Sequence, residues 1–385
     1  MLMDGSVERE NGEVCAEDGR MSPFPAGFRA GHTKGMPKPN SHYPKAWASL
    51  PVHLQVASCF SFLRGTTRIP DLISSAKERE FDAIALTDRN GIYGAIEFYK
   101  KAKDAGIKPI IGVTLDEAEE KKPTHPNGNG NGKAIPIRTL TILAKNRSGY
   151  GEVCRLITKR KLDENFKLAE ITPDAVPNCV LITLSPELLE KLALRFSVKE
   201  LYAGMLPPID TEGMTQAQEI LTIAKKLGRK IVAVNDVHFL NPAEHTIHRL
   251  LRAIDENETI YTVSSVVSRA RYLMSAEEME RAFSDFPDAL IATREIAEEC
   301  NLEFELGKWV FPHFPLPPGV TAEERLRKLC LEGLNRRYPK LTRKHFERLN
   351  YELSVIEKLG YAGYLLAVYD IVQEANRRGY LTLGV

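Results

Sequence analysis

The chain has 385 residues, with 52 Lys and Arg against 51 Asp and Glu, which gives a formal charge of +1. Hydrophobic residues make up 43% and charged residues 27%, which is typical of a soluble globular protein of two or three domains. No apolar run approaches the roughly 18 to 20 residues of a membrane helix, and the N-terminus MLMDGSVERE lacks a signal-peptide pattern. The near-zero charge removes any global argument for nucleic-acid binding and leaves only local patches.

The six cysteines are scattered over positions 15, 59, 154, 179, 300 and 330, and no two form a C-x-x-C pair. This pattern argues against a disulfide framework and against a structural zinc site, and it is typical of a reducing cytosol. We therefore expect a cytoplasmic protein with no membrane partner.

Three stretches rich in glycine and proline divide the chain. Residues 1–46 hold 6 Gly and 5 Pro without helical or strand period, which predicts a disordered leader, and Met21 and Met36 are alternative starts. Residues 121–133 predict a flexible surface loop. Residues 311–321 predict an ordered crossing between domains.

Between these stretches, apolar strand patterns alternate with amphipathic helical patterns. The predicted strands are 50–56, 82–88, 108–115, 139–145, 178–185 and 230–238, and the predicted helices are 70–80, 93–106, 149–161 and 215–228. Such alternation is typical of parallel strands joined by right-handed crossovers, and so predicts an α/β layer or barrel. After about residue 274 only helical patterns with Ser or Thr caps follow, over 275–283, 288–301, 321–338 and 342–360.

Polar side chains follow several of these strands, at the edge where α/β domains place their chemistry. They are His53, Gln55, Asp88, Arg89, Asn90, Thr114, Asp236 and His238. A set of His, Asp and His on separate strand ends can bind a hydrolytic metal. The same residues can equally serve as turn caps and satisfied polar groups, and their spacing leaves both interpretations open.

At these residues the chain resembles a known family. The segments VHLQVASCFSFLRG (52–65), ALTDRNGIYGAIEFYKKAKDAGIKPIIG (85–112) and VNDVHFLNP (234–242) resemble the polymerase-and-histidinol-phosphatase (PHP) domain, in the version that opens the alpha subunit of bacterial DNA polymerase III. Residues 274–301, 311–338 and 349–379 are similar to the helices that join that domain to the polymerase palm. The resemblance implies a distorted (β/α)₇ PHP barrel over 47–270, followed over 271–385 by a helical connector and a truncated start of the polymerase core.

The family's strand ends carry up to nine ligands for a cluster of metal ions, and this sequence departs from that set. The second His of His-x-His is Gln55, the Asp of Ser-x-Leu-Asp-Gly is Arg64, the His of Thr-Asp-His is Arg89 (after Asp88), and the Glu that follows Ile-Gly is Thr114. Only His53, Asp236 and His238 remain at ligand positions.

Two permanently charged guanidinium groups at ligand positions weigh against a metal cluster, because they offer no lone pair and repel cations. We expect the zinc, manganese or magnesium of the family to be lost and the site to be vestigial. A single metal on His53, Asp236 and His238 remains the alternative. We also expect Arg64 or Arg89 to form a salt bridge with Asp236 or Asp88.

Two further patterns are weaker. His245-x-x-His248 has a zinc-binding spacing but no third ligand nearby, so we expect these histidines to pack. Residues 325–348 hold nine Lys and Arg against two Glu, which is typical either of a phosphate-contacting surface or of a solvated helix face.

The motifs Thr-Asp-Arg-Asn-Gly and Phe-Ser-Phe-Leu-Arg-Gly resemble the error-prone paralogue of the alpha subunit more than the replicative one.

The chain stops at YLTLGV, whereas the family's palm and its three catalytic aspartates lie further downstream. The resemblance therefore implies an N-terminal piece of a nucleotidyltransferase that is inactive alone, with DNA, other polymerase subunits or translesion accessory proteins as partners of the full-length protein. The alternatives are a stand-alone PHP-type phosphoesterase or 3′–5′ exonuclease, and a binding module for polymerase partners.

Overall fold

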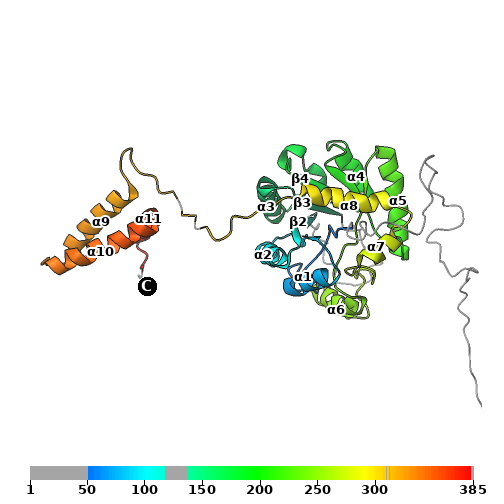
Figure 1. The fold of residues 1–385 in the computed structure, drawn as a ribbon, viewed down its shortest axis with the longest axis horizontal. Coiled ribbons are helices and arrows are strands. Elements are labelled where there is room, and N and C mark those ends of the chain that lie inside the picture. Colours follow the sequence, from blue (N-terminus) through cyan, green and yellow to red (C-terminus); the bar gives the residue numbers. More distant parts are fainter. Residues whose placement is uncertain (1–50, 118–137, 309, 312, 383–385) are drawn as a thin grey trace, which may run out of the picture. The chain divides into compact units, whose positions relative to one another are not determined.

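The computed structural model describes residues 51–117, 138–308, 310–311 and 313–382. The predicted leader (1–46) and the predicted loop (121–133) lie outside these residues. The chain divides into two compact units, one ending at Phe304 and one beginning at Glu305, and Figure 1 shows the elements of each.

The first unit is built on a curled six-stranded sheet whose spatial order follows the chain. Its strands are β1 (Ala83–Leu86), β2 (Lys108–Asp116), β3 (Thr139–Ala144), β4 (Cys179–Thr183), β5 (Leu201–Met205) and β6 (Ile231–Ala233). β1 and β2 are parallel, and so are β4, β5 and β6. The expectation of an all-parallel sheet is wrong for β3, which runs antiparallel to both neighbours. A strand pattern reports extended backbone and burial, but it carries no information on direction.

Residues 51–56 of the predicted strand 50–56 form no regular strand, yet they join the two edges of the sheet. The amide of Ala85 donates to the carbonyl of His53, and the amide of Val237 donates to the carbonyl of Gln55. An isolated parallel bridge pairs Val56 with Val237. This segment therefore lies between β1 and the residues after β6, as in a distorted barrel.

Helices pack around the sheet, and the four that were predicted have bounds within a few residues of those expected. They are α1 (Ile69–Glu78), α2 (Ala95–Ala105), α3 (Arg147–Leu162), α4 (Pro186–Ala193), α5 (Thr211–Leu227) and α6 (His245–Glu256). Helix α2 ends at Gly106 in the left-handed region (φ 77°), where glycine carries no Cβ penalty. Helix α4 and strand β5 were not predicted from the sequence.

The strands are buried on both faces, so the inside of the curled sheet is packed with side chains. Cys179 and Leu181 of β4 pack in a hydrophobic cluster with residues of α3, α4 and α5, which we call the outer cluster. Val180 and Ile182 pack in a second cluster with residues of the other strands, which we call the inner cluster. This is the two-residue alternation of a strand that is covered on both sides.

Helices α7 (Ala276–Ala282) and α8 (Pro287–Glu299) belong to this first unit. Ala292, Ile296 and Ala297 of α8 are buried in the inner cluster together with strand residues. The first compact unit therefore extends to Phe304, past the predicted end of the PHP domain at residue 270, because the apolar face of α8 packs in the core of this unit. Helical period alone cannot say which unit a helix packs against.

The second unit contains α9 (Ala322–Arg337), α10 (Arg343–Leu359) and α11 (Ala362–Arg377). Its core is small and consists of Leu326, Leu353, Ala362 and Leu366 with partly buried neighbours. Residue 311 and residues 313–320, in the predicted crossing, carry no helix or strand. Among the helices of the described residues, none has the length and apolar character to span a membrane.

Candidate functional site

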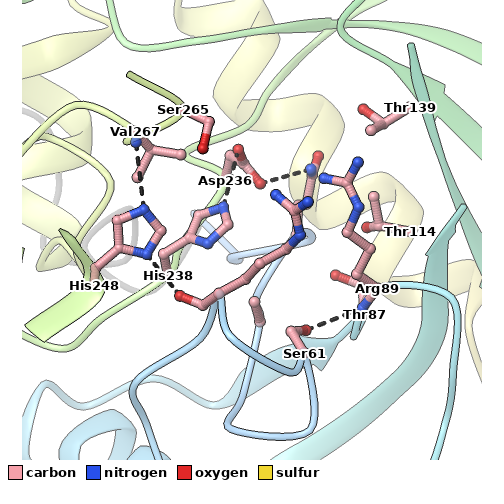
Figure 2. A pocket seen from close by; sticks show the side chains of 13 residues that line it. Ser61, Thr87, Arg89, Thr114, Thr139, Asp236, His238, His248, Ser265 and Val267 are labelled. Atoms are coloured by element: carbon pink, nitrogen blue, oxygen red, sulfur yellow. Dashed lines mark hydrogen bonds and ion pairs between the residues drawn. The ribbon is translucent and has the colours of Figure 1, made fainter. Parts of the chain in front are cut away.

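A small cavity of about 90 Å³ opens where the sequence places its polar strand-end residues (Figure 2). Six of the eight predicted site residues line it, namely Gln55, Arg64, Arg89, Thr114, Asp236 and His238. The other two, His53 and Asp88, do not line it. Thr139 does, because the antiparallel β3 begins opposite Asp116, at the end of β2. Sequence reasoning missed Thr139, since it follows from the direction of β3.

Asp236 is the carboxylate of this cavity, and both of its oxygens are engaged. Gln55 donates from Nε2 to Oδ1 at 2.8 Å, and the His238 ring nitrogen Nε2 lies 3.4 Å from Oδ2. Burial alone would raise the pKa of Asp236, but the imidazole of His238, followed by the charges of Arg271 and Arg89, lowers it to about 2. Asp236 also has a φ of 48°, a left-handed conformation that is uncommon outside glycine and frequent at functional sites.

Arg89 does not pair with Asp236 or Asp88, so the expected salt bridge is wrong. Its Nε donates to Oδ2 of Asp116 at 2.6 Å, and Arg160 donates from Nη2 to Oδ1 of the same carboxylate at 2.7 Å. Burial would raise the pKa of Asp116, yet the charge and hydrogen bond of Arg89, with those of Asn90 and Arg160, hold it below its usual range.

Asp116 was missed from the sequence because no family ligand is expected there. A signal was available, however. Asp116 lies two residues after Thr114 on β2, and side chains two apart on a strand share a face. Thr114, which replaces the family's Glu, therefore has the carboxylate of Asp116 on the same face of β2, two residues further along the chain.

Arg64 reaches the same cavity with only a distant carboxylate partner. Its Nη2 lies 3.9 Å from Oδ2 of Asp255, and Arg252 binds that carboxylate much more closely. Burial, followed by the neighbouring charges of Arg89 and Arg252, lowers the pKa of Arg64 to about 10. The guanidinium groups of Arg64 and Arg89 therefore repel each other across one cavity.

Asp88 turns away from the cavity and fastens the loop that carries Arg64. It accepts hydrogen bonds from the amide of Ser58 at 2.7 Å, from the Ser58 hydroxyl, and from the Ser61 hydroxyl at 2.7 Å. Burial raises the pKa of Asp88, and the Ser61 and Ser58 hydrogen bonds offset part of that rise. This is the turn-cap role that the sequence left open.

His53 faces a different part of the core. Its Nε2 donates to the carbonyl of Met274 at 2.9 Å, and its ring packs edge-on against Phe81 at 5.2 Å between centroids. Burial lowers the pKa of His53 to about 4, so the ring is neutral at pH 7. The structure therefore does not bring His53 together with Asp236 and His238.

The donor set of the cavity does not fit a metal cluster. Gln55 and Thr114 are neutral, Arg64 and Arg89 are cations without lone pairs, and Asp236 is already engaged on both oxygens. Within the described part of the chain, no group of three His, Cys, Asp or Glu side chains is arranged to hold a metal.

His245 and His248 hold backbone rather than a shared ligand. His248 donates from Nδ1 to the Arg64 carbonyl at 2.7 Å and accepts at Nε2 from the Val267 amide at 3.4 Å. His245 donates from Nε2 to the Val267 carbonyl at 2.9 Å. As expected from the sequence, both histidines pack, and both hydrogen-bond to Val267. Figure 2 shows His248 and Val267 beside the cavity.

Arg271 is a further residue that sequence reasoning did not single out. It is almost fully buried (1% exposed) and lies 3.3 Å from a carboxylate oxygen of Glu212. Its charge contributes to the low pKa of Asp236. No spacing pattern in the sequence would predict this effect on Asp236, because Arg271 lies in an irregular segment.

The comparisons with known proteins agree with this architecture. Residues 53–196 match the family described as the PHP domain, and residues 324–384 match the "Bacterial DNA polymerase III alpha NTPase domain". The first unit therefore contains a PHP domain, with a mixed α/β sheet and a polar cavity at its strand ends. One solved structure that matches part of the chain is an amidohydrolase from Chromobacterium violaceum, with a TM-score of 0.35, 12% identity, and coverage of 49% of this chain and 87% of that chain.

The sequence relatives narrow the identification. The chain is 30% identical over 350 residues to the DNA polymerase III subunit alpha of Bacillus subtilis, covering 86% of this chain and 30% of that protein. It is 31% identical over 374 residues to an error-prone DNA polymerase of Symbiobacterium thermophilum, covering 86% of this chain and 33% of that protein. The chain is thus homologous to the N-terminal region of DNA polymerase III alpha subunits, and it spans about a third of the length of these relatives.

Proposed function

We propose that the chain is the N-terminal part of a C-family DNA polymerase that acts in DNA replication or translesion synthesis. Two observations support this proposal. The PHP match and the polymerase match occur in one chain and in order, and curated alpha subunits align along 86% of it. In this proposal, nucleotidyl transfer belongs to the longer protein, and its partners are DNA and other polymerase subunits in the cytoplasm.

The role of the PHP unit in this proposal is that of a scaffold without a metal-dependent hydrolytic centre. The observation that carries this is the pairing of Arg89 with Asp116 at 2.6 Å. The guanidinium of Arg89 stands at a ligand position of the family and pairs with the carboxylate of Asp116. A side-chain cation, and not a divalent ion, therefore neutralises that carboxylate. No hydrolytic step is assigned to this unit.

An error-prone enzyme with translesion accessory partners is the finer form of the proposal. The motifs Thr87-Asp88-Arg89-Asn90-Gly91 and Phe60 to Gly65 favour it, because they combine the two arginines that replace family ligands. The fidelity of the full-length enzyme on undamaged and abasic templates distinguishes an error-prone polymerase from a replicative one.

The basic stretch 325–348 is the proposed DNA-facing part of the second unit. It spans α9 and the first part of α10. Arg343 and Arg348 are exposed and pair with Glu347 and Glu352 on their own helix. Exposed pairs of this kind stabilise a helix only slightly and exchange readily for phosphate contacts.

The test has two arms. The 385-residue chain and the product of the same gene with its downstream reading frame are assayed for extension of a primed template. We expect incorporation only from the longer product, and template-dependent synthesis by the repurified short chain would contradict the proposal. In the second arm, the chain is assayed for phosphoesterase and 3′–5′ exonuclease activity with added Zn²⁺, Mn²⁺ or Mg²⁺. Metal-dependent hydrolysis there would favour the stand-alone phosphoesterase instead.

A further inference from the structure

The cavity of the PHP unit has more positive charge than its carboxylates neutralise. Two guanidinium groups, those of Arg64 and Arg89, and one carboxylate, that of Asp236, line it. The Asp236 oxygens are engaged by Gln55 and His238, and neither guanidinium lies within ion-pair distance of Asp236.

The outside partners of the two arginines do not remove this excess. Asp116 is shared between Arg89 and Arg160, and Asp255 is held closely by Arg252 and only at 3.9 Å by Arg64. Asp116 thus serves two guanidinium groups, and because Arg252 also binds Glu256 at 2.8 Å, the weakly held guanidinium is that of Arg64, 3.9 Å from Asp255. Unbalanced charge in a partly buried site is costly, so an anion that enters the cavity is attracted by the guanidinium charge that these carboxylates do not neutralise.

Two buried side-chain nitrogens of the cavity are also left without a partner among the described residues. They are Nη2 of Arg89, which is a donor, and Nδ1 of His238, which donates only when the ring is protonated because Nε2 faces the acceptor-only carboxylate of Asp236. His238 is only 8% exposed, its other ring nitrogen is used by Asp236, and both residues line the cavity. Buried polar atoms without a partner are rare in native proteins and call for an explanation such as a bound ion.

The size of the cavity limits what can bind. About 90 Å³ is several times the 10 to 15 Å³ that one water needs on this measure, and it is too small for a nucleoside. A fork of guanidinium donors matches the oxygens of phosphate. Hydroxyl groups of Thr114 and Thr139 stand on the wall of the cavity nearest Arg89 (Figure 2).

We propose that this cavity binds a phosphate group between the guanidinium groups of Arg64 and Arg89, without metal and without hydrolysis. The positions at which the family uses metal ions would thereby hold an anion with side-chain cations. The source of the group is either free inorganic phosphate or the terminal phosphate of a nucleic acid strand. The proposal concerns the PHP unit alone, so its failure would leave the polymerase assignment untouched.

The test uses the full 385-residue chain in buffer with EDTA and with ionic strength held constant by NaCl. Inorganic phosphate is titrated by calorimetry, and binding is checked by a saturable rise of the melting temperature. A 5′-phosphorylated deoxyoligonucleotide is compared with its unphosphorylated form. Saturable phosphate binding by the unmodified chain supports the proposal, and competition by the phosphorylated strand identifies a strand end as the source.

The variants separate specific binding from general salt stabilisation, since phosphate stabilises many proteins by exclusion from their surface. Arg64→Met should weaken phosphate binding about ten-fold to a hundred-fold, the range for loss of a charge-assisted hydrogen bond. Arg89→Lys keeps a charge for Asp116, and should also weaken binding because it loses the planar fork. Arg155→Met is the matched control, because Arg155 is exposed on α3 and outside the cavity.

Two results would overturn the proposal. One is the absence of saturable binding of either probe to the unmodified chain. The other is equal phosphate affinity in the unmodified chain and in Arg64→Met, with the circular dichroism spectrum of the variant unchanged. If Arg64→Met does not fold, Arg89→Lys gives the same decision.

Discussion

The Nε atom of Arg89 lies 2.6 Å from Oδ2 of Asp116, across the ends of β1 and β2. Both side chains are mostly buried, at 16% and 12% exposed. The pair brings a cation to a ligand position of the PHP family and balances it with a carboxylate outside the family's ligand set. The stability of this strand edge therefore depends on side-chain ion pairs.

Asp116→Asn should destabilise the first unit by about 3 kcal/mol, because it leaves Arg89 and Arg160 without their shared carboxylate in a partly buried site. The measurement is urea unfolding followed by circular dichroism. Asp71→Asn is the matched control, since Asp71 pairs with Arg68 on the exposed face of α1, and it should change stability little. If the two substitutions change the free energy of unfolding equally, the ion pairs of Asp116 with Arg89 and Arg160 stabilise the fold no more than an exposed pair does.

The stability of the first unit should fall as the pH drops from about 6.5 towards 4. The pKa of His53 is lowered from 6.5 to about 4 in the folded chain, so folding favours the neutral ring. The stabilisation is complete above the unfolded pKa of 6.5 and is lost as the pH falls towards the folded pKa. A shift of this size corresponds to about 3 kcal/mol.

His53→Gln should flatten this dependence while leaving part of it, because the pKa of His248 is also lowered to about 4. The measurement is the free energy of unfolding in urea at several pH values between 7 and 4, for the unmodified chain and the variant. Identical slopes in the two proteins would mean that His53 is not buried in its neutral form.

Gly65→Ala should destabilise the loop that carries Arg64, for lack of space. A Cβ at Gly65 would lie 2.1 Å from the carbonyl oxygen of Ser58, a backbone atom that cannot move aside cheaply. We expect a loss of stability on the order of 2 kcal/mol or more, seen as a lower melting temperature.

Gly333→Ala is the control for that substitution. A Cβ at Gly333 meets nothing within 4 Å, and the residue lies inside α9. Alanine there should stabilise the helix by about 0.5 to 1 kcal/mol. If Gly65→Ala is as harmless as Gly333→Ala, the close approach of residues 58 and 65 is not part of the fold.

A chelator should leave the melting temperature of the unmodified chain unchanged, because Asp116 and Asp236 at the strand ends are engaged by side chains, Arg89 and Gln55 among them. The measurement is thermal unfolding with and without EDTA, together with elemental analysis of the purified chain. Two or three tightly held metal ions per chain, or a drop in melting temperature with EDTA, would contradict this expectation.

The alternation of helices and strands, and the position of polar residues at the strand ends, could be predicted from the amino-acid sequence. Both follow from local physics, since apolar period and capping residues depend on neighbours a few positions apart. Six of the eight predicted site residues line one cavity, because parallel strands such as β1 and β2 bring their carboxyl ends together.

Which of these side chains are in contact could be learned only from the folded chain. Arg89 binds Asp116 rather than Asp236, His53 faces Met274 and Phe81, β3 runs antiparallel, and α8 packs in the barrel unit. Each of these depends on groups far apart in the sequence competing for the same partner or the same surface. A sequence pattern shows which groups are available, whereas the outcome of that competition is set by distance and burial in the folded chain.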